Sequence, residues 1–283
     1  MKRFLRGAFA AGCLFPVAAM AQSAPPPDNE PNIFDGDFLV VGAGVVVTPR
    51  YEGADSTMIT PAAGVAGRIA GIGISPRDSG IALNFIPAPR NAKVRFQLGP
   101  VGVYNDNRDA HSGDAVVDKL HPLDDTFEAG IATGFSVQRV LNPYDSVSMG
   151  VDVRWDTSGH DGARLVSVGG TYLTPVSRAQ IVALSVAMDF VNDGWADYTY
   201  SVSPADSVAS GLPVYSAKGG MKDWGLRFYT GYDLDGNLLN GGFALVAGMG
   251  YTRLTGSAAE TPITALRGSR DQWMGGVGLA YTF

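Results

Sequence analysis

The sequence has little cysteine, little charge and no long apolar run after its start, and each shortage excludes a class of protein. Its 283 residues include one cysteine, Cys13, so no disulfide can form within the chain. No stretch of about 18 apolar residues follows residue 21, which excludes a bundle of transmembrane helices. Charged residues are 17% of the chain, below the usual quarter, and the mean hydropathy is only +0.07.

What the sequence has in quantity is glycine and aromatic residues. There are 37 glycines, and aromatic residues make up 10% of the chain. Many glycines and aromatics together with few charges suit a β-barrel that exposes half of its side chains to lipid. If the chain lies in a membrane, it must do so as a closed barrel, because lipid cannot satisfy an open sheet edge.

Residues 1–21 have the features of a cleavable signal peptide. A basic start (Lys2, Arg3, Arg6) precedes an apolar segment, and Ala19-Met20-Ala21 is a cleavage site of the A-x-A type. Cleavage would remove three of the 21 Lys and Arg and none of the 27 Asp and Glu, so the net charge changes from −6 to −9. Such an acidic chain is a poor partner for nucleic acid. The alternative, a lipoprotein cut before Cys13, would strand an apolar segment on the mature chain.

The remaining chain divides into a short arm and one domain. Residues 22–36 are rich in proline and acidic residues and predict a flexible periplasmic arm. Residues 37–283 alternate between strand-like and turn-rich segments, so we expect one barrel there.

Strict alternation of apolar and polar residues predicts most of the strands. It is clearest at 147–156, where Val147, Met149, Val151, Val153 and Trp155 alternate with small or polar residues. Further strands are predicted at 127–138, 182–190, 224–233, 243–251 and 273–283, with weaker candidates at 37–48, 57–70, 79–86, 93–104, 164–175 and 197–203. The prediction is an all-β, transmembrane, antiparallel up-and-down barrel of 12 strands, with 10 as the alternative.

The last strand carries a C-terminal assembly signal. The chain ends on Phe283, with Tyr281 two residues before it. This resembles the signature that the barrel-assembly machinery of Gram-negative bacteria recognises in outer-membrane proteins. An exposed terminal strand can be captured by strand addition before it pairs with the first strand. We therefore expect export to the outer membrane, with membrane lipid and that machinery as partners.

The polar faces of the predicted strands carry charges of both signs. If these faces point inward, the lumen charges are Glu128, Asp152, Arg154, Asp189, Arg227 and Asp233. They could pair into a plug or line a water-filled pore, and the sequence does not decide between the two. Many aromatics lie near strand ends and predict interfacial girdles: Tyr51, Trp155, Trp195, Tyr198, Tyr200, Trp224, Tyr232, Tyr251, Trp273 and Tyr281.

Catalysis has weak support in the sequence. His111-Ser112 and Ser158-Gly159-His160-Asp161 contain residue types used in hydrolases, but both lie in turn-rich stretches and no G-x-S-x-G elbow is present. The third histidine, His121, completes no metal-binding spacing. We predict no catalytic, cofactor-binding or metal-binding residues.

Several motifs are similar to those of the MipA/OmpV family, the MltA-interacting proteins of the outer membrane. They are Pro49-Arg50-Tyr51-Glu52-Gly53, Ser158 to Gly162, Tyr172-Leu173-Thr174-Pro175, Asp197 to Val202, Gly211 to Tyr215 and Tyr251 to Ala258 followed by Thr261-Pro262-Ile263. The resemblance runs from about residue 37 to the end. Thr261-Pro262 stands where Ser-Pro is expected, and Ala54 where a serine is common.

The resemblance implies an outer-membrane barrel without catalytic residues. It implies a scaffold that docks periplasmic murein enzymes, a lytic transglycosylase and a murein synthase, through periplasmic turns and the arm. A porin-like channel for small solutes is the alternative. A lipid-modifying enzyme, or an adhesin acting through outer loops near 105–125 and 203–221, has less support.

Overall fold

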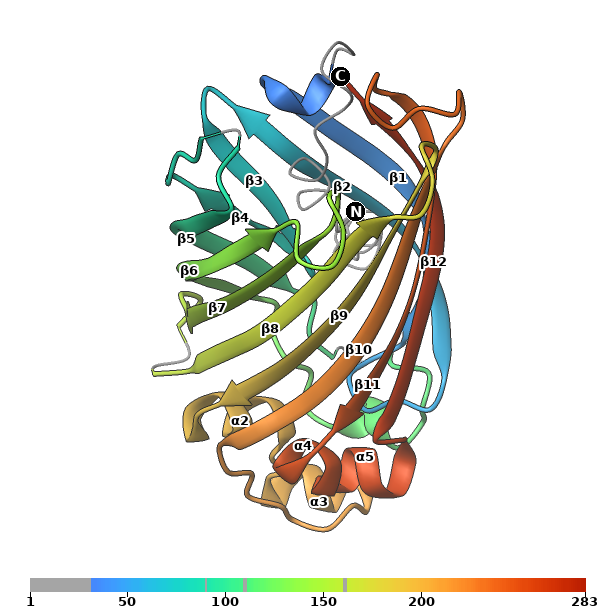
Figure 1. Cartoon of the computed structure of the whole chain (residues 1–283). Coiled ribbons are helices and arrows are strands. Elements are labelled where there is room, and N and C mark those ends of the chain that lie inside the picture. Colours follow the sequence, from blue (N-terminus) through green and yellow to red (C-terminus); the bar gives the residue numbers. More distant parts are fainter. Residues whose placement is uncertain (1–31, 90, 109–110, 160–161) are drawn as a thin grey trace.

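The structure, a computed structural model, is a closed barrel of twelve antiparallel strands (Figure 1). It describes residues 32–89, 91–108, 111–159 and 162–283. Each strand pairs with its neighbours in the sequence, and the last strand pairs with the first. This confirms the predicted fold class and strand number. The signal peptide and residues 22–31 of the arm lie outside the described residues.

The strands are of two lengths. Ten are long, with 11 to 14 residues each, and two are short. In order, they are β1 (Phe38–Pro49), β2 (Thr57–Ile69), β3 (Ile72–Arg77), β4 (Gly80–Asn84), β5 (Val94–Asn105), β6 (Thr126–Gln138), β7 (Ser146–Asp156), β8 (Arg164–Pro175), β9 (Gln180–Val191), β10 (Gly220–Asp233), β11 (Gly242–Leu254) and β12 (Asp271–Thr282).

One predicted strand was wrong and one real strand was missed. Residues 197–203 were expected to form a strand, because they are rich in Tyr and Thr. Most of them instead belong to helix α2 (Asp193–Tyr200), because the Asn192 side chain accepts a hydrogen bond from the Trp195 N–H and caps the helix. The missing strand is β3, which has only six residues and contains Pro76.

The outer face of the barrel is apolar between two aromatic belts. Near one end, the Tyr251 ring contacts the rings of Trp224 and Trp273, with centroids 5.7 and 4.9 Å apart. Near the other end, Tyr281 contacts Phe243 and Phe283. Trp273 and Tyr281 lie on the same strand, about 26 Å apart at ~3.3 Å per residue. Since strands are tilted, this separation suits the apolar band of a membrane barrel.

The two ends of the barrel differ in their connections. The longest connection at the end with the C-terminus is 85–93, whereas the other end has 192–219 and 255–270. Membrane barrels have short periplasmic turns and longer outer loops, so we call the first end the turn end and assign it to the periplasm. The short helix η3 (Ile33–Asp35) lies at the turn end, with Phe34 buried against Phe38.

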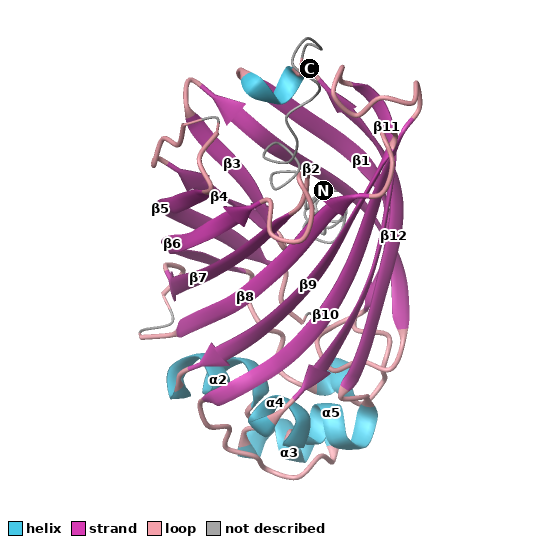
Figure 2. Ribbon diagram, viewed as in Figure 1, coloured by secondary structure: helices cyan, strands magenta, loops and turns pink. Residues whose placement is uncertain are grey.

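Helices gather at the opposite end, where they form a cap (Figure 2). They are α2, α3 (Pro204–Ser210), α4 (Gly256–Glu260), α5 (Pro262–Arg267) and the short η4 (Val117–Lys119). The helical cap, residues 50–56, 106–108, 111–125, 192–219 and 255–270, has its own apolar clusters. One contains Tyr51, Val117, Leu212 and Ile263. Among the described residues, no helix is long and apolar enough to cross a membrane.

Four aromatics assigned to the girdles, Tyr51, Trp195, Tyr198 and Tyr200, belong to this cap. Tyr51 is buried in the cluster just described, and Tyr200 is buried in a second one, against which Trp195 packs. The prediction was wrong for them because they lie in loops or helices that fold over the barrel end. Aromatics of a membrane girdle and aromatics of the cap both lie near strand ends in the sequence, so that position did not distinguish them.

Candidate functional site: a charged layer across the lumen

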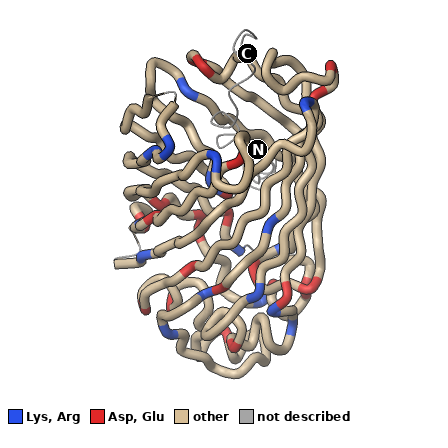
Figure 3. The backbone as a smooth tube through the Cα atoms, viewed as in Figure 1, with Lys and Arg blue, Asp and Glu red and all other residues tan. Residues whose placement is uncertain are grey.

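Alternation along each strand sends apolar side chains outward and polar ones into the lumen. On β7, Asp152 and Arg154 are buried inside while Met149 and Trp155 are exposed outside. Charges of both signs are interspersed where the strands approach the helical cap (Figure 3). We call this group the charged layer; it consists of Glu52, Arg77, Asp78, Glu128, Asp152, Arg154, Asp189, Lys222, Asp223 and Arg227.

The hairpin of β3 and β4 ends in this layer and connects to two distant strands. Arg77 donates from Nε to Asp152 Oδ2 on β7 at 2.5 Å, and from a terminal nitrogen to Oδ1 at 3.3 Å. Asp78, the next residue, pairs with Arg227 on β10 at 3.1 Å. Since β7 and β10 are separated by two strands, the hairpin tip spans part of the lumen. Two opposite charges in adjacent positions therefore fix the tip inside the barrel.

Lys222 is the cation at the centre of the second cluster. Its Nζ lies 3.1 Å from Asp223, 3.4 Å from Glu52 and 3.6 Å from Asp189. It also lies 5.4 Å from the centroid of the Trp195 ring, within range of a cation–π contact. The pairing of β10 with β9 shifts between Met221 and Asp223, so Lys222 is the extra residue of a β-bulge. A bulge can re-aim a side chain, which brings Lys222 to the inside.

A third cluster joins the layer to the cap. Glu128 is almost fully buried, accepts a hydrogen bond of 2.9 Å from Trp195 Nε1 and lies 3.4 Å from Arg154 Nε. Arg154 also donates to the Ser167 hydroxyl. A buried carboxylate is costly without partners, and here an indole and a guanidinium supply them.

Tyr200 of α2 ties the cap to Glu52. Its hydroxyl donates to Glu52 Oε1 at 2.6 Å. Burial, followed by the negative charge of Glu52, raises the pKa of the Tyr200 hydroxyl well above its usual value. Tyr200 therefore stays protonated and keeps donating at any physiological pH.

Two cavities meet at the charged layer. The one towards the turn end has a volume of about 530 Å³, and the one under the cap about 750 Å³. Both are lined by Asp78, Arg154, Asp189, Asp223 and Arg227. The lumen is thus neither a fully packed core nor an unobstructed pore, because ion pairs stand where the two cavities touch.

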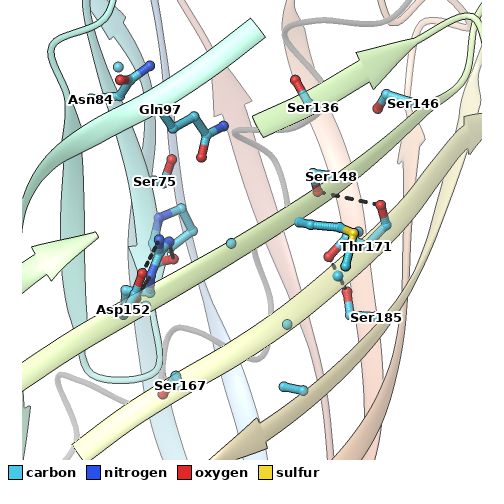
Figure 4. Close-up of a pocket in the computed structure, with 18 of the residues that line it drawn as sticks. Ser75, Asn84, Gln97, Ser136, Ser146, Ser148, Asp152, Ser167, Thr171 and Ser185 are labelled. Atoms are coloured by element: carbon cyan, nitrogen blue, oxygen red, sulfur yellow. Dashed lines mark hydrogen bonds and ion pairs between the residues drawn. The ribbon is translucent and has the colours of Figure 1, made fainter. Parts of the chain in front are cut away.

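Hydroxyl groups line the cavity on the turn side. Figure 4 shows Ser136, Ser146, Ser148, Ser167, Thr171 and Ser185 around it, with Asp152 at one side. Thr171 and Ser185 are hydrogen-bonded at 2.8 Å, and Ser148 donates to the Thr171 carbonyl at 3.4 Å. This wall offers neutral donors and acceptors, in contrast to the charged layer on the side of the cap.

The predicted lumen charges fall into two groups. Five of them, Glu128, Asp152, Arg154, Asp189 and Arg227, lie together in the charged layer. The sixth, Asp233, lies at the turn end of β10, where its carboxylate accepts from the Asp235 and Asn237 N–H groups. Its environment is that of a turn.

Sequence reasoning missed five members of the layer, namely Glu52, Arg77, Asp78, Lys222 and Asp223. Three lie in or beside connections and two at a bulge, so alternation gave no signal for them. Adjacent Arg77-Asp78 in an otherwise apolar stretch was the one usable hint.

The residues weighed for catalysis take part in loop hydrogen bonds. Ser112 donates to Asp118 at 2.7 Å, and the Ser158 hydroxyl accepts from the Phe127 N–H. His160 lies outside the described residues. Across the part of the chain that the structure describes, no group of three or more His, Cys, Asp or Glu is arranged to hold a metal ion.

The predicted assembly signal lies where β12 closes the barrel. Tyr281 is opposite Val41 of β1, and Phe283 exchanges backbone hydrogen bonds with Leu39. Phe283 remains 62% exposed. Recognition of these residues by assembly machinery stays a prediction.

Comparison with known proteins gives one family match. Residues 41–283 match the family model described as MltA-interacting protein MipA. A search of the curated proteins finds no match.

Similar solved structures are outer-membrane proteins of low sequence identity. An outer-membrane channel from Pseudomonas putida F1 has 13% identity and a TM-score of 0.42, covering 93% of this chain and 98% of that chain. The toluene transporter TodX of Pseudomonas putida has 10% identity and a TM-score of 0.39, covering 97% and 95%. At these values the likeness says nothing about what this chain binds or transports.

Proposed function

Because this outer-membrane barrel belongs to the family of MltA-interacting protein MipA, we propose that it docks a periplasmic murein enzyme, a lytic transglycosylase of the MltA type, on its turn end. A murein synthase held beside that enzyme would complete the scaffold that the resemblance implies. The docking surface, rather than the lumen, would then carry the function of the protein.

The observation that carries this proposal is a row of exposed apolar side chains on successive turns. Leu141 lies in the β6–β7 turn, Val176 in the β8–β9 turn and Leu234 in the β10–β11 connection, and they are 77%, 57% and 52% exposed. These turns follow each other around the rim. Backbone hydrogen bonds from the Asp233 N–H to the Ala179 carbonyl and from the Leu238 N–H to the Arg178 carbonyl join the last two. Exposed apolar rows of this kind are typical of protein interaction sites.

The turn that presents Leu141 is held rigidly. The Asp145 carboxylate accepts from the N–H groups of Val140, Leu141 and Asn142 at 2.7 to 3.3 Å, and from the Tyr172 hydroxyl at 3.0 Å. Burial opposes ionisation of Asp145, but these donors outweigh it and leave its pKa below the usual value. A pre-ordered turn loses little entropy on binding, which favours a docking role.

The test is binding of the transglycosylase to the mature barrel in nanodiscs, measured by biolayer interferometry. The enzyme is the MltA-type transglycosylase of the same organism. Leu141→Asp would place a charge in the interface, so we expect at least about a tenfold loss of affinity. The matched control is Val208→Asp in α3, an apolar residue of the helical cap that is even more exposed, at 89%.

Unchanged affinity in Leu141→Asp and in the equivalent Val176 and Leu234 variants would exclude the turn end as the docking surface. An equal loss of affinity in Val208→Asp would show that the loss is not specific to the turn end, which would contradict the proposal.

A second candidate, a regulated passage for small polar solutes, is favoured by the two cavities that meet at the charged layer. Solutes would pass from the hydroxyl-lined cavity to the larger one when the hairpin tip moves. Arg77→Ala removes the ion pair with Asp152, so it should raise single-channel conductance in planar bilayers over that of the unaltered barrel. Arg253→Ala, which breaks an exposed ion pair with Asp271 outside the lumen, is the control. A silent Arg77→Ala barrel of native fold would dispose of this candidate.

A further inference from the structure

The pairing of β2 with β3 ends early and leaves one edge of β2 open. The paired residues are 67–69 of β2 and 72–74 of β3. On its other side, β2 pairs with β1 from Thr57 to Arg68. Within the described residues, positions 57–66 of β2 therefore have a partner strand on one side only, while β3 continues to Arg77 beside β4.

Prolines explain where the two strands part. Residues 70 and 71, both with positive φ, form the two-residue turn between β2 and β3, so Ile69 and Ile72 are a hydrogen-bonded pair. Along an antiparallel ladder, every second residue forms hydrogen bonds with the partner strand. After Ile72, the β3 residues whose backbone groups face β2 are therefore Ile74 and Pro76. Pro76 has no N–H to donate, so the ladder stops after Ile74.

The open edge of β2 also contains a proline. The β2 residues that face β3 are the odd-numbered ones, and they include Pro61, a second residue without an N–H. The N–H groups of Ile59, Ala63 and Val65 remain, as do the carbonyls of the same positions. We call this edge and the diverging β3 the seam.

The seam lies at the depth of the membrane. Through β1, Ile59 is level with Gly275 and Val65 with Tyr281. The open edge thus runs between the aromatic belts at Trp273 and Tyr281. In hydrocarbon an unpaired backbone edge is costly, and irregular backbone is tolerated at this depth where it lines a water-filled space.

The larger cavity lies directly behind the seam. It is lined by Met58 and Thr60 from β2 and by Asp78 and Ser79 at the hairpin tip, one from each side of the gap. The tip is held away from β2 by the ion pair of Asp78 with Arg227 and by the hydrogen bond from the Tyr104 N–H to the Ser79 carbonyl. Water in the cavity can therefore reach the edge of β2.

We propose that the seam between β2 and β3 is a lateral opening of the lumen into the membrane, which admits the zwitterionic head of an amphiphile while its chain stays in the hydrocarbon. The exposed outer side of the edge, with Ile59 at 72% exposure, contacts the chain. The wet inner side solvates the head. This goes beyond the docking function and does not depend on it.

The charge of the larger cavity selects the head. Six carboxylates and five basic side chains line it, so both signs are present in nearly equal number. Arg50 and Arg108 lie on the side of the cap, and Asp189 and Asp223 deeper in the lumen. A head that carries a phosphate and an ammonium group can pair with both signs of this lining, whereas an uncharged sugar head offers it hydrogen bonds only.

The first test compares directly opposite residues on β1 and β2. Single cysteines replace Ile59 or its β1 partner Val47, and Ala63 or its β1 partner Ala43; the two members of each pair lie at one depth. The variants are made in the mature barrel, which lacks Cys13, and are placed in nanodiscs. A nitroxide on each cysteine is exposed to a water-soluble nickel complex. We expect several-fold faster relaxation at positions 59 and 63 than at their β1 partners, with the larger difference at 59. Equal rates in both pairs would overturn the opening.

The second test identifies the occupant. Lysophosphatidylcholine added to the nanodiscs should lower the collision rate of the nickel complex at position 59 several-fold and leave position 47 unchanged. Dodecyl maltoside and lysophosphatidylglycerol are the comparison amphiphiles. Absence of protection by lysophosphatidylcholine, or equal protection by all three, would overturn the assignment of a zwitterionic head.

A sealing variant checks that the seam itself is responsible. Pro76→Val restores the N–H donor that β3 lacks, so β3 can continue its ladder along β2. In the register that pairs Ile69 with Ile72, its last residue, Arg77, then lies opposite Gly64. We expect the difference between positions 63 and 43, beside the end of the extended ladder, to shrink several-fold in this variant. An unchanged difference between positions 63 and 43 in a variant that keeps its heat-modifiable migration would overturn the role of the seam.

Discussion

Strands β6 to β12 pair along almost their whole length, whereas β3 and β4 contact their outer neighbours through three residue pairs each. β11 and β12 have twelve paired positions, and β2 and β3 have three. The long ladders need only alternation and small residues at crowded points. The short hairpin is instead positioned by two ion pairs and limited by a proline. We call β6 to β12, together with the strand β1 that closes on β12, the long-ladder wall, and β3 with β4 the short-paired wall. The long-ladder wall is specified by the period of the sequence, and the short-paired wall by individual residues.

The largest expected effect comes from adding one methyl group to each wall. A Cβ on Gly44 would lie 2.2 Å from the Val277 carbonyl oxygen of β12, where the barrel closes. A Cβ on Gly73 of β3 would lie 3.3 Å from the Cβ of Asn84, a contact that a shift of a few tenths of an ångström relieves. We expect Gly44→Ala to lower the free energy of unfolding by about 3 kcal/mol or more, and Gly73→Ala to change it by less than about 1 kcal/mol.

The measurement is urea unfolding in detergent micelles, followed by tryptophan fluorescence. Gly275→Ala is the control for the closing pair of strands, since its Cβ would have an ordinary contact of 3.5 Å. Similar losses of unfolding free energy in Gly44→Ala and Gly73→Ala would mean that the two walls tolerate an added methyl group equally well.

The sequence also predicts the long-ladder wall better than the short-paired wall. Alternation was sufficient for the strands from β6 to β12, and for the aromatic end at Tyr281 and Phe283. It missed β3, because six residues with a proline carry too little periodic signal. The total of twelve strands was right although 197–203 was helical, since the erroneous strand and the missed one offset each other.

The charged layer was predictable only in part, for a physical reason. Residues such as Asp152 and Arg154 lie on strands, where period two gives the face of each side chain. Lys222 lies in a bulge and Asp78 in a hairpin turn, and their direction depends on which strands meet across the lumen. Such partners are distant in the sequence, so no local pattern shows them.

The smallest expected effect concerns the contact that joins the two walls across the helical cap. Asp114 lies in the connection after β5, the strand that pairs with β4, and Arg267 lies in the β11–β12 connection. Arg267 donates to both Asp114 carboxylate oxygens at 2.7 to 3.3 Å. Burial opposes ionisation of Asp114. The hydrogen bonds from Arg267 and from the N–H groups of Val116 and Val117 outweigh it and lower the pKa below its ordinary value of 3.8. A lowered folded pKa means that the stabilisation is complete well above pH 3.8 and is lost as the pH falls through the folded pKa.

Arg267→Gln should therefore reduce the stability of the cap at neutral pH, and the difference from the unaltered barrel should shrink as the pH falls below about 4. The effect is small because Arg267 is well exposed and solvent screens the pair. Limited proteolysis of the 111–125 connection between pH 3 and 7 measures it, with Arg253→Gln at a comparably exposed pair as control. A difference that stays constant over this range would show that Arg267 contributes by packing and not by its charge. The two walls would then be joined through the apolar cluster of Val117 and Ile263, without help from the ion pair.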